Sequence, residues 1–478
     1  MKQHVAPLAA AFGLTALITL GCGGKDASLE DTIDVQAGTL LSGATNVSDG
    51  ITPSSVAESE TAAVSRGSVV AVAYNSGSAP TPNMRCPGYS QVAMSYLNTA
   101  STWHAIHFAP PAGINAFRGD PSIAIGDANS SNYRVWVSTL ATSTSQWNTH
   151  GGGTGCIVDT TYRSLSMDKL CVISVVIPKS GGGAATVEST TCTPTTSTYD
   201  YDGTALTAVA QVVNGSVVWQ PYLASWVDDA SLQVFKLSGA ALTPLPTPLA
   251  NQGTIWGHPI FVKGLFALIA PDKAGTFWFT QYVVSSNSWT TPFAFGSGFV
   301  WTPTDLPLGL HGGKQYAAFN VPSFMGPSTT YLVYRTGTTL VANAVQNGVP
   351  GWFRAWTAQG GGNPSRPAGA VATVSNGAGA PSYKAMISYW AVNSSNALTM
   401  RFTWIGKPNT DKGSQMPCVF DGYWGEYDEM VVQNDGTATP TFWRFGTDST
   451  KQACSIPANH DWAPSIVQHV SGFSLPPL

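Results

Sequence analysis

The sequence predicts an all-β protein whose main domain is a six- or seven-bladed β-propeller. The composition is the first reason, because 49 Gly and 32 Pro among 478 residues disfavour long helices, while a hydrophobic content of 43% suffices for a packed core. The second is a pattern of similar segments that repeats along the chain. The third is the content of each segment, which has a short apolar strand, a turn, and a strand rich in aromatic and β-branched residues.

Each repeated segment opens with a polar residue, followed by a small residue or Pro in most cases and then by an apolar strand. The seven opening residues are Glu60, Asp120, Asp202, His258, His311, Arg366 and Glu426. Repeats of roughly 40 to 50 residues with several strands are typical of propeller blades. A pair of β-sandwiches is the alternative, and the recurring opening favours the propeller. The tail SIVQHVSGF (465–473) is a candidate to close a blade begun near the N-terminus, which leaves the blade number at six or seven.

The N-terminal residues 1–21 have the pattern of a secretory signal. One early Lys precedes an apolar run over residues 5–20, which is too short for a membrane-spanning helix. The run ends in TLGC at 19–22, which resembles the lipobox of bacterial lipoproteins, apart from Thr19 where Leu is usual. The resemblance implies acylation of Cys22, and Gly23 in place of Asp implies the outer membrane of a two-membrane bacterium. An ordinary signal peptide with an incidental Cys is the alternative.

The segments that follow complete the domain organisation. Residues 22–58 are rich in Gly, Ser, Asp and Thr and show little apolar periodicity, which predicts a flexible tether. Residues 59–478 form the predicted propeller domain.

The cysteine content also indicates export. Apart from Cys22, the six cysteines form an even set with no CxxC pair, which suits disulfides and argues against a zinc ribbon or a thioredoxin-like site. These disulfide candidates are Cys86, Cys156, Cys171, Cys192, Cys418 and Cys454. Because each pair brackets one local segment, we predict Cys171–Cys192 and Cys418–Cys454.

The charge of the chain bears on its partners. The 22 basic and 26 acidic residues give a net charge of −4, and no basic run occurs. A nucleic-acid partner is therefore not expected.

The last segment carries a family resemblance. The run WGEYDEMVV, followed by GTATPTFWRFG, resembles the WGDY…FW closing blade of exported bacterial propellers in the sialidase-like superfamily. The resemblance implies a propeller over most of residues 58–475. Sialidases proper also carry Asp-box repeats and an arginine cluster that binds the substrate carboxylate. The chain has no Asp-box, and among its arginines only Arg366 opens a segment, so the departure argues against sialidase activity.

Other catalytic motifs are missing from the sequence. It contains no G-x-S-x-G elbow, HExxH, EF-hand loop or P-loop. HGGGTG at 150–155 matches an oxyanion motif by letter only and is interpreted as a loop. His104 and His107 would point to opposite faces of a strand and are interpreted as ordinary structural histidines.

The seven opening residues are the candidate binding site. In a propeller, the innermost strand of each blade starts beside the channel mouth, so these four carboxylates, two imidazoles and one guanidinium would converge there. One interpretation is structural, with the side chains binding backbone groups and channel water. The other is a ligand site, in which excess negative charge favours a cation, Ca²⁺ above all.

The function predicted from these observations is binding. The first hypothesis is a lipid-anchored cell-envelope module for a carbohydrate or protein partner. The alternative is a carbohydrate-active enzyme, a glycoside hydrolase or polysaccharide lyase that uses a carboxylate pair at the channel mouth. Several tryptophans near predicted loops are candidates to stack on sugar rings, although packing between blades is the commoner role of Trp: Trp256, Trp301, Trp352, Trp356 and Trp424.

Overall fold

The computed structural model describes residues 44–47, 58–77, 90–98, 102–143, 167–194 without 181, 199–255 without 229, 259–261 and 266–294 without 275. Beyond residue 294 it describes the strands given below and residues 434, 437, 439 and 440. The chain divides into two compact units, Met1–Asp34 and Val35–Leu478, and every described residue belongs to the second. Among the described residues, the one helical element is the 3₁₀ turn η1 (Val284–Ser286). No helix in this part of the chain is long and apolar enough to cross a membrane.

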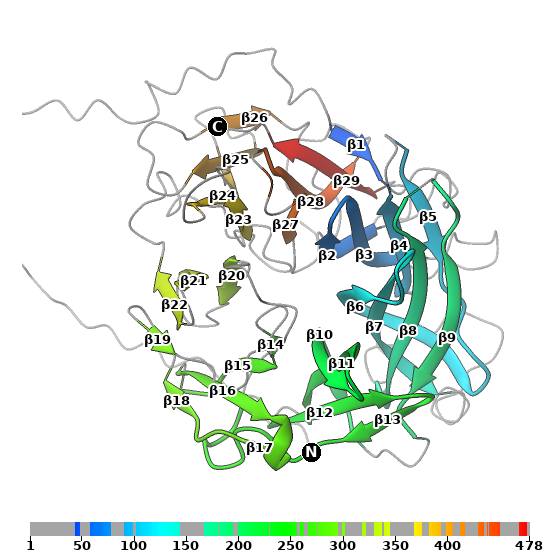
Figure 1. The fold of residues 1–478 in the computed structure, drawn as a ribbon, viewed down its shortest axis with the longest axis vertical. Coiled ribbons are helices and arrows are strands. Elements are labelled where there is room, and N and C mark those ends of the chain that lie inside the picture. The colour runs from blue at the N-terminus through cyan, green and yellow to red at the C-terminus, as the bar shows by residue number, and fades with distance from the viewer. Residues whose placement is uncertain are drawn as a thin grey trace, which may run out of the picture. The chain divides into compact units, whose positions relative to one another are not determined.

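The described strands form seven antiparallel sheets (Figure 1). In the first three sheets, each strand pairs with the next one along the chain. The first sheet contains β2 (Glu58–Arg66), β3 (Val69–Gly77), β4 (Ser90–Leu97) and β5 (His104–His107). The second contains β6 (Ile114–Asp127), β7 (Asn132–Ser143), β8 (Lys169–Pro178) and β9 (Thr186–Cys192). The third contains β10 (Tyr201–Val213), β11 (Ser216–Val227), β12 (Ser231–Ser238) and β13 (Ala241–Pro244).

The fourth to sixth sheets continue this plan. The fourth contains β14 (Ile260–Phe261), β15 (Ala267–Pro271), β16 (Phe277–Val283), β17 (Ser288–Trp289) and β18 (Phe293–Ala294), the last two both pairing with β16. In the fifth, β20 (Ala318–Val321), β21 (Thr329–Thr336) and β22 (Thr339–Ala344) are consecutive, and the earlier strand β19 (Phe299–Trp301) pairs with β22. The sixth contains β23 (Ala368–Val374), β24 (Ser382–Val392), β25 (Leu398–Trp404) and β26 (Lys412–Gln415).

The seventh sheet joins distant parts of the sequence. It contains β27 (Glu429–Gln433), β28 (Thr441–Ser449) and β29 (Gln468–Leu475), and the early strand β1 (Ala44–Asn46) pairs with β29 at its edge. The predicted tail strand therefore closes this sheet together with a strand from the N-terminal part. β1 lies inside the segment 22–58 that the sequence predicted as a tether, so the folded domain includes residues before position 59.

Six pairs of neighbouring sheets meet through the strand at one edge of each sheet, called here its first strand, which is β20 in the fifth sheet and β27 in the seventh. β6 contacts β2 and β10, β10 contacts β14, β23 contacts β20 and β27, and β27 contacts β2. Successive antiparallel sheets whose first strands lie side by side, with the last sheet against the first, are the arrangement of a β-propeller. The predicted all-β propeller is therefore confirmed.

The predicted segment starts lie within three residues of the beginnings of these first strands, apart from two. His311 lies seven residues before β20, which begins at Ala318, and Asp120 is the other. Glu60 and Asp202 are in β2 and β10, whereas β6 begins at Ile114, six residues before the predicted start at Asp120. The register of β6 with β7 shifts between Ile114 and Ala116, between Phe117 and Gly119, and between Gly119 and Ser122. The first half of β6 was not predicted, because these bulges interrupt the alternation of apolar and polar residues by which a strand is recognised in a sequence.

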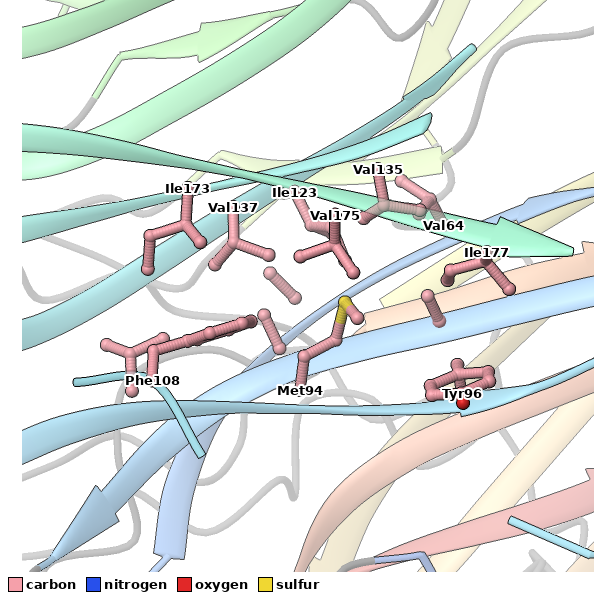
Figure 2. Close-up of a cluster of buried hydrophobic side chains, with 14 of the residues drawn as sticks. Val64, Met94, Tyr96, Phe108, Ile123, Val135, Val137, Ile173, Val175 and Ile177 are labelled. Carbon is pink, nitrogen blue, oxygen red and sulfur yellow. The ribbon is translucent and has the colours of Figure 1, made fainter. Parts of the chain in front are cut away.

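A hydrophobic core fills the space between the first and second sheets (Figure 2). Met94 and Tyr96 of β4, with Phe108, face side chains of β6, β7 and β8. The opposing residues labelled in the figure are Ile123, Val135, Val137, Ile173, Val175 and Ile177. All of these residues are buried, so the two sheets pack through an apolar layer.

Tryptophan also packs between sheets, as the commoner role predicts. Trp103, next to β5, makes edge contacts with Trp443 and Phe445 of β28, with ring centroids 5.5 and 5.7 Å apart. Met430 of β27 is also buried in the seventh sheet. Trp256, Trp352, Trp356 and Trp424 lie outside the described residues, as does the side chain of Trp301.

A charged cluster links the first three sheets at the ends of their first hairpins. Arg66 and Lys179 contact Asp127 at 2.5 and 2.6 Å. The guanidinium carbon of Arg66 also lies 4.4 Å from the ring centroid of Trp219 in β11, while the Lys179 Nζ lies 4.6 Å from the ring centroid of Tyr133. Burial raises the pKa of the Asp127 carboxyl, but hydrogen bonds from Lys179 and Arg66 outweigh it and leave the pKa below its usual value.

One predicted disulfide is present. Cys171 and Cys192 occupy directly opposed positions of β8 and β9, and their sulfurs are bonded at 2.05 Å. Cys22, Cys86, Cys156, Cys418 and Cys454 lie outside the described residues, so the Cys418–Cys454 pairing stays a prediction.

Candidate functional site

The candidate site is the end of the sheets at which their first strands begin. Of the seven predicted residues, Asp120 and Asp202 are described in full, and both are half-buried. Glu60 is described in its backbone only, within β2. His258, His311, Arg366 and Glu426 lie outside the described residues, so their convergence stays a prediction.

Asp120 and Asp202 belong to first strands that are neighbours in space. Thr204, two residues after Asp202, donates its hydroxyl to the backbone carbonyl of Asp120 at 2.6 Å. The carbonyl of Asp202 accepts a hydrogen bond from the Ser225 hydroxyl at 3.2 Å. The backbones that carry the two carboxylates are therefore fixed at one junction between the second and third sheets.

Further hydroxyl groups hold this junction together. The Ser138 and Thr204 hydroxyls are 2.9 Å apart, and the Ser122 hydroxyl accepts a hydrogen bond from the Leu206 backbone N–H at 2.9 Å. Sequence reasoning missed these residues. Their signal is the occurrence of Ser and Thr inside otherwise apolar strands, where a buried hydroxyl needs a hydrogen-bond partner.

The backbone at Asp120 has an uncommon conformation. Gly119 and Asp120 have φ values of +86° and +48°, and Pro121 follows directly. A residue before proline prefers an extended backbone with negative φ, so a left-handed Asp in this position costs free energy. Such conformations are found preferentially at ligand and active sites, where the surrounding structure holds them in place.

Both the positive φ and the neighbouring side chain require glycine at position 119. A Cβ atom at this position would lie 2.6 Å from the Asn75 Oδ1 and 2.9 Å from the Asn75 Cγ. Asn75 belongs to β3 of the first sheet and is buried. The close approach of an amide side chain to a backbone without Cβ therefore fixes the bulge that presents Asp120.

Three other carboxylates on the loops at this end have structural roles. Asp168 accepts a hydrogen bond from the Ser143 N–H, Asp200 from the Met167 N–H, and Asp228 from the Asp200 N–H, each at 2.8 Å. Carboxylates that accept backbone N–H bonds fix loops in place. These three therefore fit the structural interpretation given above for polar groups at the channel mouth.

Lys169 is buried behind the same loops. Its Nζ donates to the Pro194 carbonyl at 2.6 Å and lies 3.8 Å from the Asp168 Oδ2. Burial lowers the pKa of Lys169, and the nearby Asp168 carboxylate opposes this effect. With its ammonium group enclosed in this way, Lys169 is a positioning group for the loop and not a ligand-binding one.

The described part of the site contributes the carboxyl groups of Asp120 and Asp202, which accept hydrogen bonds when ionised. Among the described residues, no group of three His, Cys, Asp or Glu side chains is placed to hold a metal ion. Ca²⁺ binding, predicted for the full set of seven, stays a prediction. His104 and His107 lie at the two ends of β5, and His104 stacks on Tyr96 with ring centroids 5.1 Å apart, in line with their interpretation as structural histidines.

Comparison with known proteins gives likeness in fold only. No family model and no curated protein matches the sequence. A sialidase from Trypanosoma rangeli matches with a TM-score of 0.38 at 10% identity, over 88% of this chain and 55% of that one. An α-L-arabinanase from Penicillium chrysogenum matches with a TM-score of 0.37 at 10% identity, over 90% of this chain and 98% of that one.

A lectin is also among the similar structures. The Aleuria aurantia lectin matches with a TM-score of 0.33 at 9% identity, over 75% of this chain and 94% of that one. This chain spans about half the length of the trypanosomal sialidase chain. At these scores and identities, no activity or ligand of these proteins is transferred to this chain.

Proposed function

We propose that this protein binds a carbohydrate ligand at the end of the propeller where the first strands begin, with Asp120 and Asp202 as hydrogen-bond acceptors. The observation that carries the proposal is the junction at Thr204, which holds these two half-buried carboxylates on adjacent strands, one of them on a left-handed backbone. An ionised carboxylate only accepts hydrogen bonds, and a sugar offers several neighbouring hydroxyl donors. The other five predicted residues complete the site in this proposal.

The proposal is tested by a glycan array with the wild-type chain and the double variant Asp120→Asn, Asp202→Asn. Asn keeps the size of Asp but turns half of each acceptor group into a donor, so we expect binding to fall at least about tenfold, or about 1.4 kcal/mol. Glu188→Gln is the matched control. Glu188 is an exposed carboxylate paired with Arg134 at 2.7 Å, and it lies on β9, away from the junction. Equal binding by the double variant and the wild type would contradict the assignment.

A turnover assay on the same glycans distinguishes a binding module from the enzymatic alternative. A binding module leaves the bound glycan intact. Release of shortened or unsaturated products, lost in Asp120→Asn or Asp202→Asn alone, would instead indicate a hydrolase or lyase, since both reactions need a particular carboxyl group as acid, base or nucleophile. A protein partner would be indicated if no glycan binds and a protein retained by the wild type is not retained by the double variant.

We also propose that the protein is an outer-membrane lipoprotein anchored through Cys22. The support is the TLGC sequence at 19–22 and the Cys171–Cys192 disulfide, which suits an oxidising compartment. Mass spectrometry of the mature protein should find an acylated N-terminal Cys22, and Cys22→Ser should release the protein into the soluble fraction. An unmodified N-terminus elsewhere would overturn this proposal.

A further inference from the structure

The hairpin between β10 and β11 exposes a group of apolar side chains. β10 and β11 pair as far as Val213 and Ser216, and the turn between them is Asn214-Gly215, with φ values of +51° and +77°. An Asn-Gly turn with both φ positive is the tight turn that fits the twist of a β-hairpin. We call residues 211–218 the hairpin tip. Its four valines are 45 to 57% exposed: Val212, Val213, Val217 and Val218.

The hairpin tip extends beyond its own sheet. β12 pairs with β11 only over Tyr222 to Val227, so no described strand continues the sheet next to residues 216–221 on that side. The tip is therefore a two-stranded ribbon. Its sequence, QVVNGSVV, contains no charged residue, although exposed strand ends are ordinarily protected by charges.

The valines lie on both faces of this ribbon. Val212 is directly opposite Val217, so these two share a face. Val213 and Val218 are adjacent to them in sequence and point to the other face, because side chains alternate along a strand. A flat protein surface can cover only one of the two pairs. A partner that covers both must surround the tip, as the boundary layer of a lipid bilayer does.

The base of the tip carries the groups suited to a membrane surface. Trp219, directly after Val218, packs on the hydrophobic cluster of the second and third sheets, and the Arg66 guanidinium lies over its ring. Arg66, Lys179 and Asp127 together have one net positive charge, and the nearby Arg134–Glu188 pair is neutral. Cations at the base of an apolar segment suit the headgroup level of a bilayer, where they interact with anionic lipid phosphates.

We propose that the hairpin tip inserts its valines into the surface layer of a lipid bilayer, with Arg66 and Lys179 at the headgroups. The insertion is shallow, because the outer edges of a two-stranded ribbon need water or headgroups as hydrogen-bond partners. The proposal concerns the opposite end of the first strands from the carbohydrate site. It does not depend on acylation of Cys22.

The test is co-flotation with lipid vesicles of the chain from residue 22 onward carrying Cys22→Ser, which keeps every described residue and removes any acyl chain. Two pair variants are compared, Val212→Thr with Val217→Thr, and Val213→Thr with Val218→Thr. Thr keeps the β-branched shape and strand preference of Val while replacing a methyl with a hydroxyl. Val284→Thr is the control, since this valine is 45% exposed and lies in η1, directly after β16 of the fourth sheet.

We expect the parent chain to bind vesicles of phosphatidylcholine with phosphatidylglycerol more strongly than vesicles of phosphatidylcholine alone. Each tip pair should weaken this binding by about tenfold, because two apolar groups no longer enter the lipid, and Val284→Thr should leave it unchanged. No vesicle binding by the parent, or binding that neither tip pair weakens, overturns the proposal. So does a parent dimer, found by light scattering, that the tip variants turn into monomers, because the tip would then be an interface between two copies.

Discussion

At the residue scale, Gly119 is constrained both by its backbone and by its neighbours. It combines a positive φ with the close approach of Asn75 to the place where a Cβ would stand, and it precedes the left-handed Asp120. The residue therefore couples the packing of the first sheet to the backbone that presents a site carboxylate. The effect of the Asn75 contact on stability can be measured, because Gly182 also has a positive φ but has no atom close to its missing Cβ.

We expect Gly119→Ala to lower the free energy of unfolding by about 2 to 4 kcal/mol, from the left-handed backbone and the steric contact together. Gly182→Ala is the matched variant, with φ of +65° and no atom within 4 Å of the added Cβ, and should cost about 1 kcal/mol. Urea unfolding of both variants measures the difference. Equal effects would mean that Asn75 moves aside freely, so that it does not fix the bulge.

A second residue-scale prediction concerns Tyr222 at alkaline pH. Burial raises the pKa of Tyr222 to about 12, a hydrogen bond from Gln211 partly opposes it, and the ring stacks on Phe266 with centroids 3.7 Å apart. Because the folded pKa is above the unfolded value near 10, the contribution to stability is complete below pH 10 and is lost as the pH rises towards 12. Over this range, the wild type should lose about 3 kcal/mol through this group.

The Tyr222→Phe variant isolates this effect, since Phe has no proton to lose. Between pH 8 and pH 11, the denaturant midpoint of the wild type should fall more than that of the variant. Parallel decreases in the two proteins would show that Tyr222 does not carry the alkaline sensitivity.

At the scale of elements, the contacts that join the sheets are of two kinds. Most are apolar, such as the layer between the first and second sheets, and some are single polar links between hairpin ends. Asp127, at the end of β6, is the main link of the second kind, since it contacts Arg66 from β2 and Lys179, which follows β8. Its effect should be visible in the response of stability to acid.

We expect Asp127→Asn to lower the free energy of unfolding at neutral pH by about 1 kcal/mol, because both ion pairs are partly exposed and screened by water. The folded pKa of Asp127 lies below its unfolded value, so this contribution is present above the ordinary carboxyl range and is lost as the pH falls through the lower folded pKa. The difference between wild type and variant should therefore disappear in acid. A constant difference between pH 7 and pH 2 would assign the loss to packing instead of charge.

Elements also show which parts of the fold the sequence could predict. Most first strands begin close to their polar opening residues, because a short apolar run after a turn is a local signal. Cys171 and Cys192 were paired correctly because they bracket one hairpin. The first half of β6 was missed because three bulges break its alternation. The Arg66–Asp127–Lys179 cluster had no signal in the sequence, and the Ser and Thr residues of the Thr204 junction gave no indication of their partners. Residues far apart in sequence meet only through the packing of neighbouring sheets.

At the scale of the whole molecule, the fold depends on closure of the propeller by contact between the first and seventh sheets. The first and seventh sheets are in contact through β2 and β27, and a shared hydrophobic cluster contains Ala63, Tyr74, Val431 and Phe445. Val47, directly after β1, belongs to the same cluster and is 1% exposed. β1 was not predicted because three residues, Ala-Thr-Asn, carry no periodicity. Its position is set by the edge of β29.

This closure predicts different stabilities for two chains that are shortened at the N-terminus. A chain that begins at residue 48 loses β1 and Val47, and one that begins at residue 44 keeps both. We expect the shorter chain to be less stable by about 3 kcal/mol or more, because it exposes the edge of β29 and leaves a cavity beside Val431 and Phe445. The chain from residue 44 should match the full-length protein.

The form of the unfolding transition tests whether the closure acts on the whole propeller. Because the apolar cluster at Val47 is shared by the seventh and first sheets, and the first sheet packs on the second, the loss should spread through neighbouring sheets. Calorimetry should then show one transition at a lower temperature for the chain from residue 48. A separate early transition, with the main one unchanged, would mean that the seventh sheet opens by itself and that the remaining sheets do not need the N-terminal strand.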